Sequence, residues 1–316
     1  MTSIPPIGLG TWKIPKNEAE DIVYKAIVEA GVRHIDCACD YGNEVEVGKG
    51  IKKAINEGFV TRENLWITSK LWNTYHHKEH VELAIKKSLS DLQLNYLDLY
   101  LIHFPICLKY VPFEDRYPPE WVYDVNEGVI VQDPVPISET WSSMEQLVHK
   151  ELTKYIGVCN FNVQSLTDLL SYANIKPYIN QIEVHPLLTQ HKLIDFCYNN
   201  NIKVTSFSPL GSLSYIELNM DSGLGKGLLQ NPIITGIAES KKKSPAQVIL
   251  RWHIQRGLIP IPKSTKIERI KENFNIHDFN LSDEEFTLIS SLNIGKRFND
   301  PGEFCKSMGG SIPIYD

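Results

Sequence analysis

The sequence predicts an α/β protein whose chain folds into a (β/α)8 TIM barrel with long loops at the C-terminal face. Short apolar strand patterns alternate with amphipathic helical patterns along nearly all of the 316 residues. Eight strand patterns occur, which is the number that closes a parallel barrel. An open, doubly wound sheet is the runner-up, but such sheets usually carry a Gly-x-Gly-x-x-Gly turn after an early strand, and this sequence has none there. We therefore expect residues 1–316 to form a single barrel domain.

Each predicted strand is a short run of mainly apolar residues bounded by turn residues. These runs cover residues 7–10, 34–36, 65–70, 97–102, 155–159, 179–183, 203–207 and 258–261. Helical periodicity covers residues 18–30, 44–57, 78–92, 138–149, 163–172, 190–200 and 245–255. Two helix starts have their own signals, because Ser244 precedes a proline and Ser282 opens a capping box with Glu285 before a last helix.

Two connections, residues 104–137 and 208–231, are longer than barrel loops usually are. The first contains several aromatic residues among prolines: Tyr110, Phe113, Tyr117, Trp121 and Tyr123. Long ordered loops of compact domains tend to be functional, so we expect this one to cover a binding site.

Composition and charge exclude several classes of partner. The net charge of −6 and the pI near 6.0 provide no basic surface for nucleic acid. The sequence contains no signal peptide and no apolar run of about 18 residues, which predicts a cytoplasmic protein without a membrane span. Six cysteines without a repeated Cys-x-x-Cys spacing predict reduced thiols. Cys37 and Cys39 are expected to be a buried pair, with a metal site as the alternative.

Four polar residues follow or end consecutive strands, where the active site of a barrel lies. Asp36 ends the second predicted strand, Tyr41 follows it, Lys70 ends the third, and His103 follows the fourth. Each residue alone has a structural explanation: a cap for Asp36, a surface ion pair for Lys70 and a core histidine for His103. Their occurrence together predicts an active site.

The chemistry that suits these residue types is carbonyl reduction. Hydride transfer to a carbonyl carbon leaves an alkoxide that needs a proton, which the Tyr41 phenol can donate. A neighbouring ammonium, Lys70, is expected to lower the phenol pKa, and Asp36 is expected to hold that ammonium. His103 would orient the carbonyl and stabilise its developing charge. This chemistry requires no metal.

The ordered motifs resemble those of the aldo-keto reductase superfamily over most of the chain. They are the segments at residues 7–12, 34–38, 41–44, 66–72, 98–103, 156–161, 180–183, 206–211 and 259–264. The resemblance implies that Asp36, Tyr41, Lys70 and His103 are the catalytic tetrad and that the cofactor is NADPH, with NADH as a weaker alternative.

The same resemblance implies a set of cofactor-binding residues. Asn160 and Gln181 would hold the nicotinamide carboxamide, and Phe207, where the family usually has tyrosine, would stack on the ring. Cys159 replaces a usual serine beside Asn160. The implied set also includes Thr11, Trp12, Ser208, Leu210, Ser212, Glu217, Lys263, Ser264, Thr265, Arg269, Glu272 and Asn273. Without the resemblance, the charges around Arg269 would equally suit a solvated helix face.

Within the superfamily, the sequence most resembles the xylose, aldose and plant aldose-phosphate reductases. By that analogy the substrate is an aldose such as xylose or another small aldehyde, contacted by Trp12, Asp40, Trp72, Phe104 and Asn299. Core packing is the alternative role for the three aromatic residues. Gly302 departs from the xylose reductases, which carry an aromatic residue there. We expect a monomer or a weak dimer.

Two other functions remain open. The first is an NADPH-binding regulatory or redox-sensing subunit with weak reductase activity, a role of some superfamily members. The second is a metal-dependent hydrolase that would use His76, His77 and His80, or His103 with His185. The intact tetrad favours the reductase over both.

Overall fold

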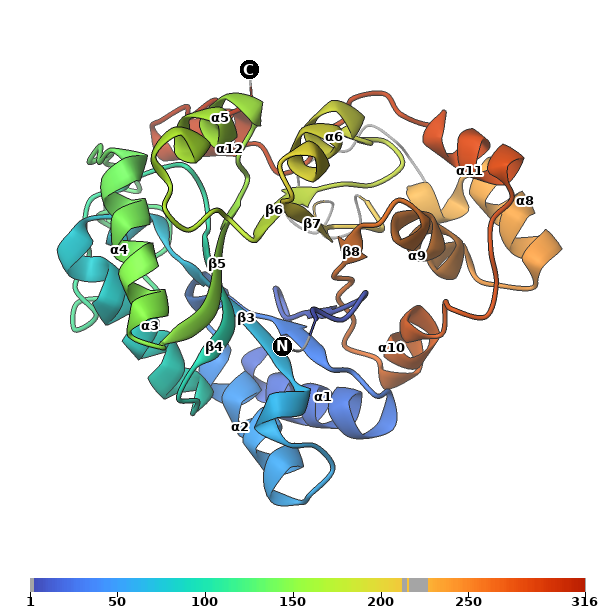
Figure 1. Cartoon of the computed structure of the whole chain (residues 1–316), viewed down its shortest axis with the longest axis horizontal. Coiled ribbons are helices and arrows are strands. Elements are labelled where there is room, and N and C mark those ends of the chain that lie inside the picture. Colours follow the sequence, from blue (N-terminus) through green and yellow to red (C-terminus); the bar gives the residue numbers. More distant parts are fainter. Residues whose placement is uncertain (1–2, 212–214, 216–226, 316) are drawn as a thin grey trace.

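The computed structural model describes residues 3–211, 215 and 227–315. Its eight strands form one parallel sheet in which the spatial order follows the chain order (Figure 1). The strands are β1 Leu9–Gly10, β2 His34–Asp36, β3 Trp66–Leu71, β4 Leu97–Ile102, β5 Thr153–Cys159, β6 Ile179–Glu183, β7 Lys203–Phe207 and β8 Ile259–Pro260. Sequential parallel order with intervening helices is the topology of a (β/α)8 barrel, as predicted.

Hydrogen bonds between the first and last strands close the sheet on itself. The Gly8 amide donates to the Pro260 carbonyl over 3.0 Å, and the Gly10 amide donates to the Pro262 carbonyl over 3.1 Å. A Cβ atom at Gly10 would lie 2.9 Å from the Ile261 carbonyl oxygen, so only glycine fits this close approach. The closed seam excludes the open doubly wound sheet.

Helices surround the barrel (Figure 1). Those of the alternating units are α1 Lys16–Glu29, α2 Glu44–Asn56, α3 Lys78–Leu92, α4 Ile137–His149, α5 Val163–Tyr172, α6 His191–Asn199, α8 Pro232–Lys241, α9 Pro245–Gln255 and α10 Ile267–Phe274. Two further helices follow the last unit, α11 Asp283–Ser290 and α12 Pro301–Phe304. The sequence pattern missed α8, although Asn231 caps it and Pro232 begins it. It also missed α12, which is too short to show periodicity.

Both predicted helix starts are confirmed. The Ser244 hydroxyl accepts from the Gln247 amide and Ser282 accepts from the Glu285 amide, each in a complete capping box. The outer strands β1 and β8 are each two residues shorter than predicted. Prolines at positions 260 and 262 explain the short β8, because proline provides no amide to a strand ladder.

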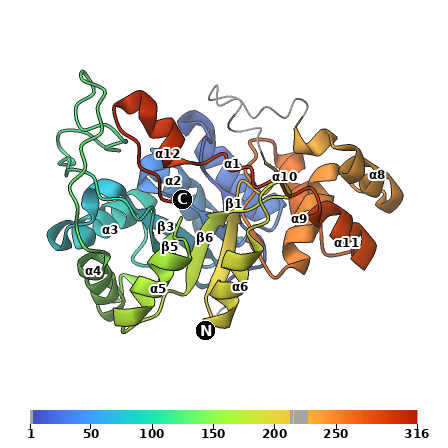
Figure 2. The same cartoon turned by 90° about the horizontal axis from the view of Figure 1, so that it is seen from above.

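Different segments of the chain lie at the two ends of the barrel (Figure 2). The long segment after β4 and helix α12 lie together at one end, whereas the N-terminal segment lies at the opposite end. All six cysteines are free, and Cys37 and Cys39 are buried among apolar side chains, as expected for a structural pair. In the described ranges, no helix combines the length and apolarity needed to cross a lipid bilayer. The cytoplasmic location stays a prediction.

Candidate active site

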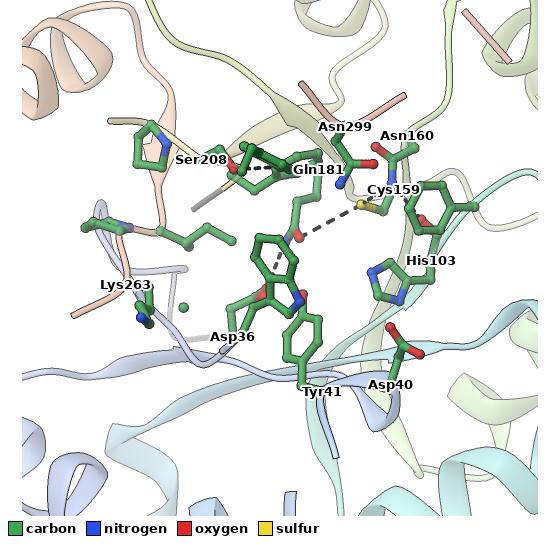
Figure 3. Close-up of a pocket in the computed structure, with 18 of the residues that line it drawn as sticks. Asp36, Asp40, Tyr41, His103, Cys159, Asn160, Gln181, Ser208, Lys263 and Asn299 are labelled. Atoms are coloured by element: carbon green, nitrogen blue, oxygen red, sulfur yellow. Dashed lines mark hydrogen bonds between the residues drawn. The ribbon is translucent and has the colours of Figure 1, made fainter. Parts of the chain in front are cut away.

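A pocket of about 300 Å³ opens where the C-terminal ends of the strands meet (Figure 3). It is a concave space large enough for a small ligand. Most of the predicted site residues line it: Trp12, Asp36, Asp40, Tyr41, Trp72, His103, Phe104, Asn160, Gln181, Phe207, Ser208, Leu210, Lys263 and Asn299. The structure therefore brings residues from many βα units to one pocket.

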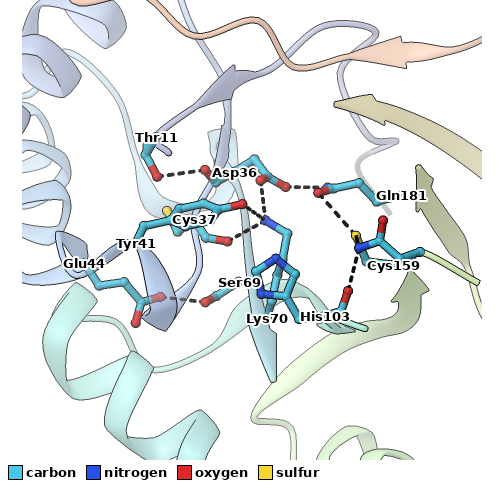
Figure 4. Close-up of polar contacts among 11 residues, drawn as sticks. Thr11, Asp36, Cys37, Tyr41, Glu44, Ser69, Lys70, His103, Cys159 and Gln181 are labelled. Atoms are coloured by element: carbon cyan, nitrogen blue, oxygen red, sulfur yellow. Dashed lines mark hydrogen bonds and ion pairs between the residues drawn. The ribbon is translucent and has the colours of Figure 1, made fainter. Parts of the chain in front are cut away.

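Lys70 lies behind the pocket and joins three groups (Figure 4). Its Nζ donates to Asp36 Oδ1 over 2.5 Å, to the Cys37 carbonyl over 2.9 Å and to the Tyr41 hydroxyl oxygen over 3.0 Å. The lysine side chain is completely buried and that of Asp36 is 2% exposed. Burial disfavours the charge, but Asp36 and Tyr41 outweigh it and raise the pKa of Lys70. The ammonium thus stays charged and in contact with the phenol.

Both carboxylate oxygens of Asp36 have a donor. Oδ1 accepts from Lys70, and Oδ2 accepts from Gln181 Nε2 over 2.7 Å. The backbone carbonyl of Asp36 also accepts from the Thr11 hydroxyl over 2.9 Å. Thr11 thus supports Asp36 from outside the pocket lining. A buried carboxylate with this many donors is compensated and held in one orientation.

Lys70 is only one of the groups that determine the pKa of Tyr41. Burial is the largest cause and raises the pKa of Tyr41 above 10, while the Lys70 ammonium lowers it and Asp36 raises it. The pKa of Tyr41 is therefore raised overall and not lowered as we expected, because desolvation of the phenolate outweighs the ammonium. The contribution of Lys70 itself lowers the pKa of Tyr41, as predicted.

His103 lines the pocket beside Tyr41. Its ring centroid is 5.9 Å from that of Tyr41 and 5.2 Å from that of Trp72, and its nearest ring neighbour is Phe104 at 5.1 Å. Burial, followed by the charge of Lys70, keeps the pKa of His103 well below 6.5. A neutral imidazole retains one N–H, which is the donor that the predicted role requires.

Two amide side chains, those of Asn160 and Gln181, also line the pocket. Asn160 Nδ2 donates to the His103 carbonyl over 2.9 Å and lies 3.2 Å from Cys159 Sγ. Cys159 Sγ lies 3.9 Å from Gln181 Oε1. Burial raises the pKa of the Cys159 thiol, so it does not provide a thiolate here. Asn160 and Gln181 therefore present amide groups of fixed position beside the tetrad.

Six residues of the implied cofactor-binding set, those at positions 263–265, 269, 272 and 273, lie between the end of β8 and the end of α10. Lys263 lines the pocket after β8, and the Ser264 hydroxyl accepts from the Lys266 amide over 3.1 Å, just before α10. Arg269, Glu272 and Asn273 lie on α10, while Thr265 and these helix residues lie outside the pocket lining. Arg269 is exposed, with no ion pair among the residues described. Ser212 and Glu217 lie outside the described residues.

More aromatic side chains surround the predicted substrate residues Trp72 and Phe104 than the sequence indicated. Trp121 lies 5.1 Å from Trp72, 5.2 Å from Phe104 and 5.1 Å from Phe304, measured between ring centroids. Neither Trp121 nor Phe304 was predicted as a site residue. The dense aromatic content of residues 104–137 was a signal for Trp121. Phe304 lines the pocket and lies two residues after Gly302 in the chain.

Two polar side chains face this aromatic enclosure. Asp40 lines the pocket, and burial together with the charge of Glu120 raises its pKa to about 7. The Oδ1 atom of Asn299 is buried without a hydrogen-bond partner in the described part of the chain. Glu183, which is itself completely buried, accepts from the Asn299 amide over 2.9 Å. The Asn299 backbone is therefore held by Glu183 of β6.

We compared the pocket with the groups of side chains that could bind a metal ion among the described residues. Within the described ranges, the one group of potential ligands that lie close together is His77, Glu79 and Glu139. None of these residues lines the pocket, and His77 Nε2 is already 3.0 Å from Asp133 Oδ2. The alternative of a metal-dependent hydrolase therefore has no support at the strand ends.

Comparisons with known proteins agree with this geometry. Residues 6–294 match the model of the aldo/keto reductase family. The chain is 48% identical to a probable NAD(P)H-dependent D-xylose reductase of Emericella nidulans, over 95% of this chain and 94% of that one. It is also 48% identical to the NADPH-dependent aldose reductase of Saccharomyces cerevisiae, over 99% and 96% of the two chains. The solved aldose reductase of Schistosoma japonicum superposes with a TM-score of 0.87 at 41% identity, covering 100% of this chain and 96% of that one. The chain belongs to the aldo/keto reductase family.

Proposed function

We propose that this chain is an NADPH-dependent reductase that converts the aldehyde group of a small substrate to an alcohol. The observation that carries the proposal is the buried contact of Lys70 Nζ with both Asp36 and the Tyr41 hydroxyl, beside His103 in the pocket. Relatives of this chain are named NAD(P)H-dependent D-xylose and NADPH-dependent aldose reductases.

The residues present fit a nicotinamide dinucleotide. Asn160 and Gln181 offer amide donors and acceptors suited to a carboxamide, and the Phe207 ring in the pocket lining suits an aromatic partner. At the other end, Lys263 and the exposed Arg269 suit a phosphate, with which guanidinium forms charge-assisted bonds. These two cations support NADPH over NADH, which lacks the 2′-phosphate.

Each member of the tetrad has a separate task in this chemistry. Bound NADPH supplies the hydride to the carbonyl carbon. Tyr41 donates its hydroxyl proton to the carbonyl oxygen, and Lys70 Nζ, 3.0 Å from that hydroxyl, stabilises the resulting phenolate. Asp36 keeps the buried ammonium paired. The neutral His103 donates its N–H to the carbonyl oxygen and orients it.

A small aldose is the substrate that we favour. Asp40 and the unpartnered Asn299 Oδ1 suit sugar hydroxyl groups, whereas Trp12, Trp72, Phe104 and Trp121 exclude water around the reacting carbonyl. Apolar walls also admit aromatic aldehydes, whose binding depends on buried area.

The alternative of a redox-sensing subunit is not favoured, because every member of the proposed proton-donating group is present and in contact. The two functions differ in turnover. Purified protein is to be assayed with NADPH and with NADH against D-xylose, a sugar phosphate and an aromatic aldehyde. We expect repeated turnover with NADPH. Turnover of all three substrates no faster than that of a Tyr41→Phe control would contradict the reductase.

A further inference from the structure

The C-terminal segment, residues 311–315, runs beside α12 and the start of α5. The Ser311 hydroxyl donates to the Gly302 carbonyl over 2.9 Å, and the Asn162 side chain donates to the Ile314 carbonyl over 3.0 Å. A Cβ atom at Gly302 would lie 3.1 Å from Pro313 Cα, so the missing side chain makes room for this segment. The segment is thus attached at both of its ends.

Tyr315 is the residue that this segment delivers to the site. Its hydroxyl donates to Asn160 Oδ1 over 2.7 Å, across 155 residues of sequence. The Arg297 guanidinium lies 3.5 Å from the centroid of the Tyr315 ring and also donates to Gln190 Oε1 over 3.2 Å. A cation over an aromatic face stabilises the ring in place. Burial raises the pKa of Tyr315 well above 10, so its hydroxyl remains a donor at neutral pH.

Asn160 needs two anchors to present one orientation of its amide. The terminal torsion of an asparagine is broad, with two nearly equivalent amide positions. The His103 carbonyl accepts from Nδ2, and the hydroxyl of Tyr315, which is not among the residues that line the pocket, donates to Oδ1. An oxygen has two lone pairs, so Oδ1 can still accept from a ligand in the pocket.

We propose that Tyr315 is a positioning residue that holds the Asn160 amide ready for the carboxamide of the nicotinamide cofactor. The inference rests on the proposed function, since it requires a nicotinamide beside Asn160. Preorganisation of a polar contact raises affinity by reducing the entropy lost on binding. The effect should therefore appear at the nicotinamide end and not at the adenosine end of the ligand.

The test compares two ligands by direct binding, with no turnover involved. NADPH reaches both ends of the site, whereas adenosine 2′,5′-bisphosphate occupies only the adenosine end. Tyr315→Phe removes the hydroxyl but retains the ring over Arg297. We expect a Kd for NADPH that is about three to ten times higher, which is the loss of one neutral hydrogen bond. The Kd for the bisphosphate should stay within about twofold, and its binding also reports a folded site.

A double-mutant cycle shows whether Tyr315 acts through Asn160. In an Asn160→Ala background, Tyr315→Phe should have no further effect on the Kd for NADPH. Tyr172→Phe is the matched control, because it removes a hydroxyl bonded to Asp168 on the exposed face of α5. An unchanged Kd for NADPH in Tyr315→Phe, an equal rise for both ligands, or an undiminished effect without Asn160 would each overturn the proposal. Failure of the wild type to bind NADPH would instead contradict the proposed function.

Discussion

Lys70 Nζ lies 2.5 Å from Asp36 Oδ1, and this ion pair is enclosed by the barrel with almost no exposure to water. A pair of this kind is costly to bury, and removal of one partner leaves an uncompensated charge. Its position behind Tyr41 suggests that the fold retains it for chemistry, because the same ammonium contacts the phenol. The pair therefore links the stability of the barrel to its proposed activity.

Lys70→Met is expected to reduce both stability and turnover. Loss of the ammonium leaves Asp36 charged in the interior, which should destabilise the protein by about 3 to 5 kcal/mol in denaturant unfolding. It also removes the group that lowers the Tyr41 pKa, so the pH profile of kcat should change. The double variant Asp36→Asn/Lys70→Met should regain part of the stability and none of the activity. A wild-type pH profile in Lys70→Met would show that the two groups are not coupled.

Tyr41→Phe should bind NADPH normally and lose reduction. The substitution keeps the ring beside His103 but deletes the proposed proton donor. General acid catalysis contributes about 100-fold to 10,000-fold, so kcat should fall within that range while the Kd for NADPH stays unchanged. Stopped-flow measurement of a single turnover separates the chemical step from product release. Retention of most of the wild-type rate would remove Tyr41 from this role.

Asp40→Asn should alter the pH dependence of stability. The folded-state pKa of about 7 exceeds the ordinary 3.8, so the folded protein binds this proton more tightly than the unfolded chain. Stability is then lost as pH rises from about 4 to 7. Because the side chain is partly exposed, we expect a gain of about 1 to 2 kcal/mol for Asp40→Asn at pH 8 and almost none near pH 4.

Thermal unfolding across this pH range provides the measurement for Asp40. Asp115→Asn is the control, because Asp115 is an exposed aspartate in the segment after β4. It removes a carboxyl group outside the pocket, so a pH-dependent change shared by both variants would not be specific to Asp40. A pH-independent difference for Asp40→Asn would mean that the Asp40 carboxyl is not desolvated.

Arg269→Ala should weaken NADPH much more than NADH. A charge-assisted hydrogen bond to the 2′-phosphate is worth about 1.5 to 3 kcal/mol, or about 10-fold to 150-fold in KM. Lys271→Ala, on the same helix, is a suitable control because Lys271 Nζ is already bound to Glu29 over 2.8 Å. The measurement is the KM for NADPH and the KM for NADH in each variant by steady-state kinetics. Equal losses for NADPH and NADH would place Arg269 away from the 2′-phosphate.

Asn299→Ala should discriminate between a sugar and an aromatic aldehyde. The buried Oδ1 has no partner within the described residues, which leaves it available to a hydroxyl group of an aldose. Loss of such a bond, worth about 1 to 3 kcal/mol, should lower kcat/KM for D-xylose by about 5-fold to 150-fold and lower kcat/KM for benzaldehyde much less.

An alternative role for the Asn299 side chain is to stabilise the turn before α12. In the structure, the side chain of Asp300 stabilises that turn. Asp300 Oδ1 accepts from the Gly302 amide over 2.8 Å and caps α12. The Asn299 backbone is held by Glu183, so the loop should survive the substitution. Uniform loss of kcat/KM for both substrates would withdraw the sugar-specific role and leave the reductase unaffected.

The sequence by itself was enough to predict the barrel and to predict that Asp36, Lys70 and His103 lie together. Strand periodicity is local, so the pattern located eight strands, and the polar residues Asp36, Lys70 and His103 stand at or next to strand ends in the sequence. Parallel strands bring such ends to one face, which makes the meeting of these residues predictable. The short helix α12 was not predicted, because four residues are too few to show helical periodicity.

Only the tertiary structure decided the electrostatic balance and the long-range contacts. Burial raised the pKa of Tyr41 despite Lys70, because desolvation depends on every group packed around the phenol. The contact of Tyr315 with Asn160, the aromatic enclosure by Trp121 and Phe304, and the anchoring of Asn299 by Glu183 join segments far apart in the chain. No local pattern encodes such pairs, since they depend on how irregular loops pack over the closed barrel.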